Sequence, residues 1–165
     1  MNRSIMAGII KVNQYQDFNG NTLFTSDGNG NLTTQKINYP AFEVNLSASQ
    51  APSDNTVTKI QFDQKDFDTD NCYDNTTNYR FTPTVAGKYF VYARSRGQTS
   101  NNTDLKTFNL YLYKNGATYG RKGTILTANY IRSASHTITE LIDMNGTTDY
   151  IEIYGMIDSA TNAAI

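Results

Sequence analysis

The chain of 165 residues has few of the side chains on which enzymes and metal sites depend. It contains one cysteine, one histidine and no tryptophan. Nucleophilic catalysis needs a thiol or hydroxyl beside a positioned base. Cys72 and His136 each lack such a partner in the sequence, so a catalytic role for either is not favoured. We interpret Cys72 as a structural thiol and His136 as a surface or edge histidine. The sequence therefore predicts a protein that is not an enzyme, and a single cysteine excludes an internal disulfide.

Charge and hydropathy exclude further classes of protein. The formal net charge is −1, whereas a protein that binds nucleic acid through phosphates shows a basic stripe. No apolar run approaches the roughly 20 residues that span a bilayer. The apolar stretch 5–10 is shorter than the core of a signal peptide and leads directly into Lys11. We expect no nucleic-acid partner, no membrane insertion, no signal peptide and synthesis in a cytoplasm.

The residues that are abundant favour β-structure. Thr occurs 22 times and Tyr 12 times, whereas the helix former Glu occurs three times. Period-two alternation places Phe108, Leu110 and Leu112 on one face of a strand, and the Asn115-Gly116 pair that follows suits a tight hairpin. Similar strands are predicted at 41–46, 57–62, 79–82, 88–94, 107–113, 137–144 and 150–155, the last two forming a hairpin across Asn145-Gly146. The pattern is typical of an all-β sandwich.

Residues 1–38 differ from the predicted sandwich, which spans 39–165. They carry too little apolar surface to bury against the backbone entropy of folding, about 1–2 kcal/mol per residue. The segment must therefore dock on the sandwich, on a symmetry mate or on another protein. The apolar residues expected to anchor it are Ile9, Ile10, Val12, Leu23 and Phe24.

The stretch 63–78 is acidic and is predicted to be a long loop. Asp66, Asp68 and Asp70 have the spacing that opens an EF-hand loop. The motif then fails, because Asn71 stands where glycine is needed and Thr77 where the bidentate glutamate is needed. A looser calcium site on these three aspartates remains open, with a solvated loop as the alternative.

Aromatic residues occur on both faces of several predicted strands. In 88–94, Tyr89 and Val91 point one way while Phe90 and Tyr92 point the other. A lone sandwich in water should be polar on its outer face, and tyrosine there is typical of a subunit interface. The alternative is a scattered set of exposed tyrosines. The predicted interface residues are Tyr111, Tyr113, Tyr150, Tyr154, Phe90 and Tyr92.

Residues 79–93, YRFTPTVAGKYFVYA, resemble the central signature of the tumour-necrosis-factor-like superfamily, which includes the globular heads of complement-type proteins. Residues 110–116 are similar to a later strand of that family with its Lys-Asn-Gly turn, and Ala41-Phe42 to its first strand. The resemblance covers about 41–158. It implies an antiparallel jelly-roll β-sandwich that assembles as a homotrimer, with aromatic residues at the axis, and that binds rather than catalyses.

Residues 8–13 and 23–33 resemble leader segments of structural proteins from tailed bacteriophages of the marine and cyanophage type. This similarity implies a virion protein that is made in the host cytoplasm and released by lysis, with residues 1–38 contacting other virion proteins of the tail or capsid.

The C-terminal end of this sequence departs from the family's pattern. Members of the family end with an aromatic strand that lies in the middle of one sheet. The C-terminal residues 159–165 are similar to the loop that leads to that strand. An unfilled slot would leave two rows of backbone groups unpaired. We expect either that the sandwich lacks its last strand in this sequence or that another segment, such as residues 5–12, fills the slot.

The sequence as a whole favours a trimeric virion protein, either a tail fibre or spike component or a capsid decoration protein. An extended N-terminal β segment would precede a jelly roll that points outward for shell stabilisation or for adsorption to a host surface glycan or receptor. The alternative is a soluble complement-like lectin module that binds glycans, with calcium held by Asp66, Asp68 or Asp70.

Overall fold

The computed structural model describes residues 13–34, 40–128, 130–159 and 163–165. Residue contacts divide the chain into two units, Met1–Tyr39 and Pro40–Ile165. None of the described residues is helical, and every pairing between described strands is antiparallel. The all-β expectation is confirmed.

The N-terminal unit contains a small three-stranded sheet. Its order is β1 (Gln14–Gln16), β2 (Thr22–Ser26) and β3 (Leu32–Thr34). The two connecting turns are built alike, because Asp17 and Asp27 each accept backbone hydrogen bonds from the residues two and four positions later. The side-chain amides of Asn21 and Asn31 also donate to Asp17 and Asp27. These amide bonds, and then the backbone bonds, stabilise the ionised carboxylates and lower the pKa of both aspartates. The sheet is thus held by its turns as well as by its few apolar contacts.

The C-terminal unit contains two larger sheets and a two-stranded ribbon. The six-stranded sheet has the order β11-β10-β13-β8-β7, with β5 also paired to β13. Its strands are β5 (Thr58–Lys59), β7 (Tyr73–Asp74), β8 (Arg80–Phe81), β10 (Leu105–Lys114), β11 (Ala117–Ile125) and β13 (Ile151–Ser159).

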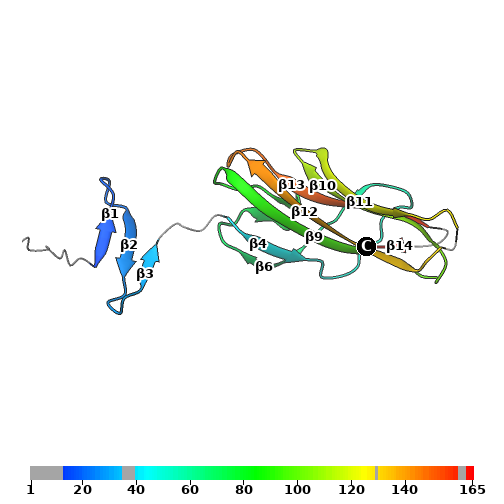
Figure 1. Ribbon diagram of the computed structural model, residues 1–165, viewed down its shortest axis with the longest axis horizontal. Helices are drawn as coiled ribbons and strands as arrows, with labels where there is room; N and C mark the ends of the chain where they lie inside the picture. The colour runs from blue at the N-terminus through cyan, green and yellow to red at the C-terminus, as the bar shows by residue number, and fades with distance from the viewer. Residues whose placement is uncertain (1–12, 35–39, 129, 160–162) are drawn as a thin grey trace, which may run out of the picture. The chain divides into compact units, whose positions relative to one another are not determined.

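The second sheet has the order β12-β9-β14, and the ribbon pairs β4 with β6. Figure 1 shows β9 and β12 as long ribbons, with β4 running beside β9. The strands are β4 (Phe42–Asn45), β6 (Gln64–Asp68), β9 (Gly87–Thr99), β12 (Ser133–Met144) and β14 (Ala163–Ala164).

One hydrophobic core lies between these sheets. Phe108, Leu110 and Leu112 of β10 are fully buried, as their alternation predicted, and they share the core with Ile138 and Ile142 of β12. Two sheets on one core are consistent with a β-sandwich.

Strand β9 passes close to β10 in the core. A Cβ atom on Gly97 would lie 2.6 Å from the ring of Phe108, so a glycine allows this close approach.

Two predictions about connections are wrong. The segments at 137–144 and 150–155 do not form a hairpin, because β12 pairs with β9 whereas β13 pairs with β10 in the other sheet. The Asn145-Gly146 turn therefore connects two sheets, and each strand places its apolar residues on the core from its own side. The acidic stretch 63–78 is not one loop, since it contains β6 and β7.

The hairpin predicted at Asn115-Gly116 is confirmed. It joins β10 to β11, and both residues have positive φ angles, 52° and 78°. Strand β11 itself was not predicted, because most of its residues are exposed and its apolar pattern is weak.

Candidate functional site

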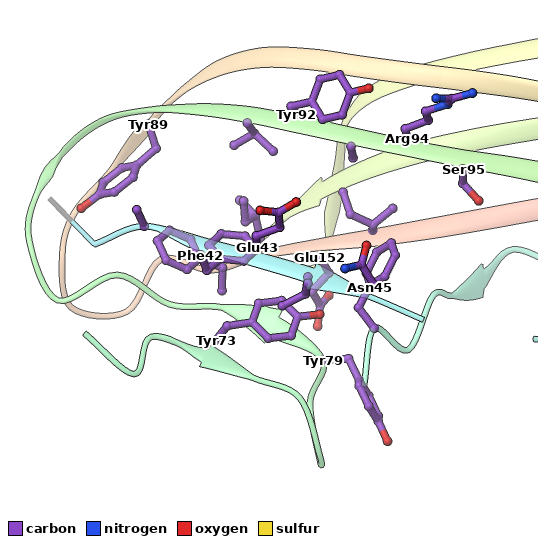
Figure 2. A pocket seen from close by; sticks show the side chains of 18 of the residues that line it. Phe42, Glu43, Asn45, Tyr73, Tyr79, Tyr89, Tyr92, Arg94, Ser95 and Glu152 are labelled. Atoms are coloured by element: carbon purple, nitrogen blue, oxygen red, sulfur yellow. The ribbon is translucent and has the colours of Figure 1, made fainter. Parts of the chain in front are cut away.

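A groove lies between β4 and β9 in the C-terminal unit. Its volume is about 760 Å³, within the range of about 300–1,000 Å³ that is usual for binding pockets. Figure 2 shows Phe42, Glu43 and Asn45 of β4 along one side and the run from Tyr89 to Arg94 of β9 along the other. The two strands run in the same direction along the groove.

The groove opens onto the hydrophobic core. Phe81, Ile151 and Ile153 of the facing sheet line it, and Phe42 and Ile153 are only partly buried although they pack on core residues. The half-covered state of these side chains means that the groove exposes interior apolar surface.

A buried polar group lines the wall of the groove. The hydroxyl of Tyr73 is buried and has no hydrogen-bond partner among the described residues. Burial, and then the negative charge of Asp74, raise the pKa of this phenol far above its ordinary value. The hydroxyl is therefore neutral at any physiological pH and can still donate a hydrogen bond.

Both strands beside the groove have a largely open edge. Strand β9 pairs with β12 along one edge, and on the other edge its paired residues in the described chain are Gln98 and Thr99, opposite β14. Strand β4 pairs with β6 on one edge, and no described strand pairs with its other edge. Open strand edges carry unpaired backbone donors and acceptors, which can pair with a further strand.

The C-terminal end of the described chain enters one end of this gap. After β14, Ile165 donates its N–H to Gln50 O at 2.7 Å and accepts from Gln50 N at 2.9 Å. Ile165 is buried, and its side chain lies against Gly155. A strand at this position therefore pairs on both sides, with β9 and with the segment that follows β4.

The outer face of the β9–β12 pair carries an apolar patch, which we call the outer patch and define as Phe90, Tyr92 and Leu141. Their exposed fractions are 72%, 60% and 59%. Phe90 lies directly opposite Leu141 in the strand register, so these side chains are neighbours on one face. The prediction that Phe90 and Tyr92 point away from the core is confirmed.

Three of the other predicted interface tyrosines, Tyr111, Tyr113 and Tyr154, lie in β10 and β13 of the six-stranded sheet, and Tyr150 directly precedes β13. The chain's own residues cover them in part. Arg121 stacks over Tyr111, which is 9% exposed. Tyr113 and Tyr154 form a ring pair with centroids 4.2 Å apart, and Tyr150 lies under Arg80. The structure thus groups Tyr111, Tyr113 and Tyr154, and places Phe90 and Tyr92 on a different sheet.

A buried ion pair lies beside this tyrosine cluster. Lys59 Nζ is 2.6 Å from Glu152 Oε1, and Glu152 is almost fully buried. Tyr154 donates its hydroxyl to Glu152 Oε2 at 3.2 Å. Burial and the charge of Glu152 raise the pKa of Tyr154 to about 12.

Of the predicted anchoring residues, the structure describes two. Leu23 and Phe24 are both in β2, where Leu23 is about half exposed and Phe24 stacks on Tyr15. Ile9, Ile10 and Val12 lie outside the described residues. The anchoring role of all five remains a prediction.

The three aspartates proposed for calcium have separate structural partners. Asp68 accepts hydrogen bonds from the backbone N–H groups of Cys72 and Tyr73, and it pairs with Lys65 at 3.2 Å. Asp66 pairs with Asn45 and Asp70 with Thr84. In the part of the chain that the structure describes, no three His, Cys, Asp or Glu residues gather as a metal site. The calcium site remains a prediction.

His136 and Cys72 both lie within packed parts of the fold. The ring of His136 stacks on Phe108, and its Nε2 is 3.2 Å from Thr124 Oγ1. Burial lowers the pKa of His136. Cys72 is a buried free thiol.

Comparison with known proteins identifies no relative: no protein-family model and no curated protein matches the chain. Among the described residues there is also no helix of the length and hydropathy needed to cross a membrane. The geometry of the groove and the outer patch is therefore the basis for a functional proposal.

Proposed function

We propose that the protein is a non-enzymatic structural component of a tailed-bacteriophage virion, built as a homotrimer of jelly-roll domains. The observation that carries the proposal is the outer patch. Three large apolar side chains lie together on the outer face of two paired strands, at exposed fractions of 59–72%. A sheet face in contact with water is normally polar, so a patch of this kind favours contact with another protein surface.

The surroundings of the outer patch favour association between copies of the chain. Lys88 and Asp143 form an exposed ion pair beside Phe90 and Leu141, so a polar rim flanks the apolar centre. Protein interfaces commonly have this composition. In the proposed trimer, Phe90 and Tyr92 lie between subunits.

The resemblance of the N-terminal residues to phage leader segments supports the virion assignment. Residues 1–38 would contact other tail or capsid proteins, while the jelly roll would face outward to adsorb to a host glycan or receptor or to stabilise the shell. The small sheet of β1–β3 fits an anchoring role, because Leu23 and Leu32 are both more than half exposed and are available for contact.

Labelling of intact particles tests the virion role. Antibodies raised against the purified chain should bind particles that are released from the cells that make it, and electron microscopy should place the label on the tail or the shell. If purified, intact particles contain no such chain, the proposed function is wrong.

A further inference from the structure

A pocket lies among β6, β7 and β8, and we call it the polar pocket. It is formed by Lys65 of β6, by β7 with the loop that follows it, and by Arg80 and Thr82 at β8. Its volume is about 400 Å³, within the range of about 300–1,000 Å³ that is usual for ligand sites. Apart from Cys72 and Tyr73, every residue that lines it is polar or charged. Such walls suit a ligand that is rich in hydrogen-bonding groups.

The guanidinium group of Arg80 is the distinctive charge of the polar pocket. It is half-buried and lies over the ring of Tyr150, at 4.4 Å from the ring centroid. In the described part of the chain, no carboxylate forms an ion pair with it. Stacking on an aromatic ring holds a guanidinium in place and leaves its N–H donors at the edge of the group available. Arg80 is therefore placed to bind a carboxylate through two parallel hydrogen bonds.

The acidic residue nearest to Arg80 in the strand register is already occupied. Asp74 lies directly opposite Arg80 in the β7–β8 pair. Its Oδ1 accepts backbone N–H bonds from Thr76 and Thr77, and its Oδ2 accepts the backbone and side-chain N–H groups of Asn78. The Asp74 carboxylate is thus committed to its own loop, which explains why it forms no ion pair with Arg80.

The same hydrogen bonds fix the wall of the polar pocket. Asn71 and Tyr79, on either side of β7 and its loop, have positive φ angles of 53° and 50°. A positive φ is rare for a bulky residue such as tyrosine, and strained backbone of this kind is concentrated at ligand sites. Because the bonds to Asp74 hold the loop in this conformation, a ligand would meet a preformed wall and would lose less affinity to ordering it.

We propose that the polar pocket binds the carboxylate-bearing sugar of an acidic glycan, with Arg80 as the anchor for the carboxylate. The side-chain hydroxyl of Thr82 and the amide N–H groups of Asn71 also line the pocket, and neither has a hydrogen-bond partner among the described residues. The hydroxyl groups of a sugar both donate and accept hydrogen bonds, so they match these free groups.

The charges around the polar pocket favour a ligand with a single carboxylate. Lys65 pairs with Asp68 at 3.2 Å, so the two charges offset each other. Arg80 is then the cation without an acidic partner among the lining residues, and a highly charged anion would also meet the negative Asp74. A peptide carboxylate would satisfy Arg80 but would leave the hydroxyl and amide groups of the wall without partners. An acidic sugar uses both.

The inference rests on the proposed function, because it assigns a ligand class to the adsorption role of the outward-facing domain. It depends neither on the groove between β4 and β9 nor on the outer patch.

Calorimetric titration of the full-length chain at pH 7 tests the proposal with three small probes. Methyl glucuronide is an acidic sugar, methyl glucoside is a neutral sugar with the same ring, and N-acetylglycine is a carboxylate without hydroxyl groups. We expect saturable binding of methyl glucuronide and binding of the other two that is weaker by about tenfold or more.

Two variants and a matched control locate the site. Arg80→Gln should weaken the binding of methyl glucuronide by about tenfold or more, and Thr82→Val, which keeps Arg80 and the size of the side chain, by about two- to tenfold. The control is Arg121→Gln, which should leave binding unchanged. Arg121 also stacks on a tyrosine, 5.4 Å from the ring centroid of Tyr111, but it does not line the polar pocket.

Several results would overturn the proposal. The wild type could fail to bind methyl glucuronide, or could bind methyl glucoside equally well, which would remove the role of the carboxylate. Equal binding of N-acetylglycine would replace the glycan with a peptide carboxylate, and an equal loss in Arg121→Gln would place the site elsewhere. Labelled particles together with a chain that binds no acidic sugar would overturn this inference alone, whereas sugar binding by a chain that is absent from particles would contradict the virion role alone.

Discussion

The ion pair of Lys59 and Glu152 should make a measurable contribution to stability, because one partner is buried. The side chains are 28% and 6% exposed, and the Nζ–Oε1 distance is 2.6 Å. Removal of one partner from a fully buried pair costs about 3–5 kcal/mol, but Lys59 reaches solvent and also donates to Asn78 O. For Glu152→Gln, which keeps the size of the side chain, we expect a loss of about 1–3 kcal/mol.

Urea denaturation of the wild type and of Glu152→Gln measures this loss through the shift in transition midpoint. The matched control is Asp143→Asn, which breaks the Lys88–Asp143 pair, whose side chains are 65% and 74% exposed. We expect that control to lose less than about 0.5 kcal/mol. Glu152→Gln should also lower the pKa of Tyr154 from about 12, because it removes a negative charge beside the phenol. Equal losses in the two variants, or an unchanged Tyr154 pKa, would refute the reasoning.

Three further predictions concern packing, turn geometry and pH. Gly97→Ala should destabilise the chain by about 1–3 kcal/mol in urea denaturation, because its Cβ would lie 2.6 Å from Phe108; an unchanged midpoint would contradict this packing. Gly116→Val should cost about 1–2 kcal/mol in the same assay, because φ is 78° there, and a stabilised variant would refute the turn. Backbone hydrogen bonds from Thr77 and Thr76 lower the pKa of Asp74 in the folded chain. The ionised Asp74 therefore stabilises the fold above the ordinary carboxyl pKa, and this contribution is lost as the pH falls below it. Thermal unfolding should thus show Asp74→Asn less stable than the wild type at pH 7, by up to about 1 kcal/mol after solvent screening, and the difference should shrink towards pH 2; a difference that grows in acid would contradict this sign.

The strands that could be predicted from sequence are those with strict alternation. In β10, Phe108 and Leu112 point to the core as the period of two requires, and Asn115-Gly116 marks the turn that follows. Strand β9 was predicted at 88–94 but extends to Thr99, because Gly97 and Thr99 are buried positions without a large apolar side chain.

The pairing of strands could not be predicted, because alternation says which face is buried and not which neighbour is bonded. Residues at 137–144 and 150–155 look like a hairpin on either side of Asn145-Gly146, yet they belong to different sheets. Strands β6 and β7 were not predicted, because their many aspartates are typical of a loop. In the structure the carboxylates bond to nearby backbone and side-chain groups, as Asp68 does with the backbone N–H groups of Cys72 and Tyr73.

The candidate site could be predicted in part. The two-faced apolar character of 88–94 indicated that Phe90 and Tyr92 are exposed. Leu141, which lies opposite Phe90, was missed because its contribution to the outer patch depends on the register of β12 with β9. The groove depends on the separation of β4 and β9 in space, which the alternation of side chains along each strand does not determine.

The solution mass of the full-length chain tests the central claim most directly. Multi-angle light scattering should give three times the 18.5 kDa of one chain. Phe90→Asp should shift the mass towards a single chain, because it places a charge in the outer patch, whereas Thr137→Asp, an exposed position on the same strand pair, should not. A wild-type mass of one chain at every concentration would contradict the proposed assembly.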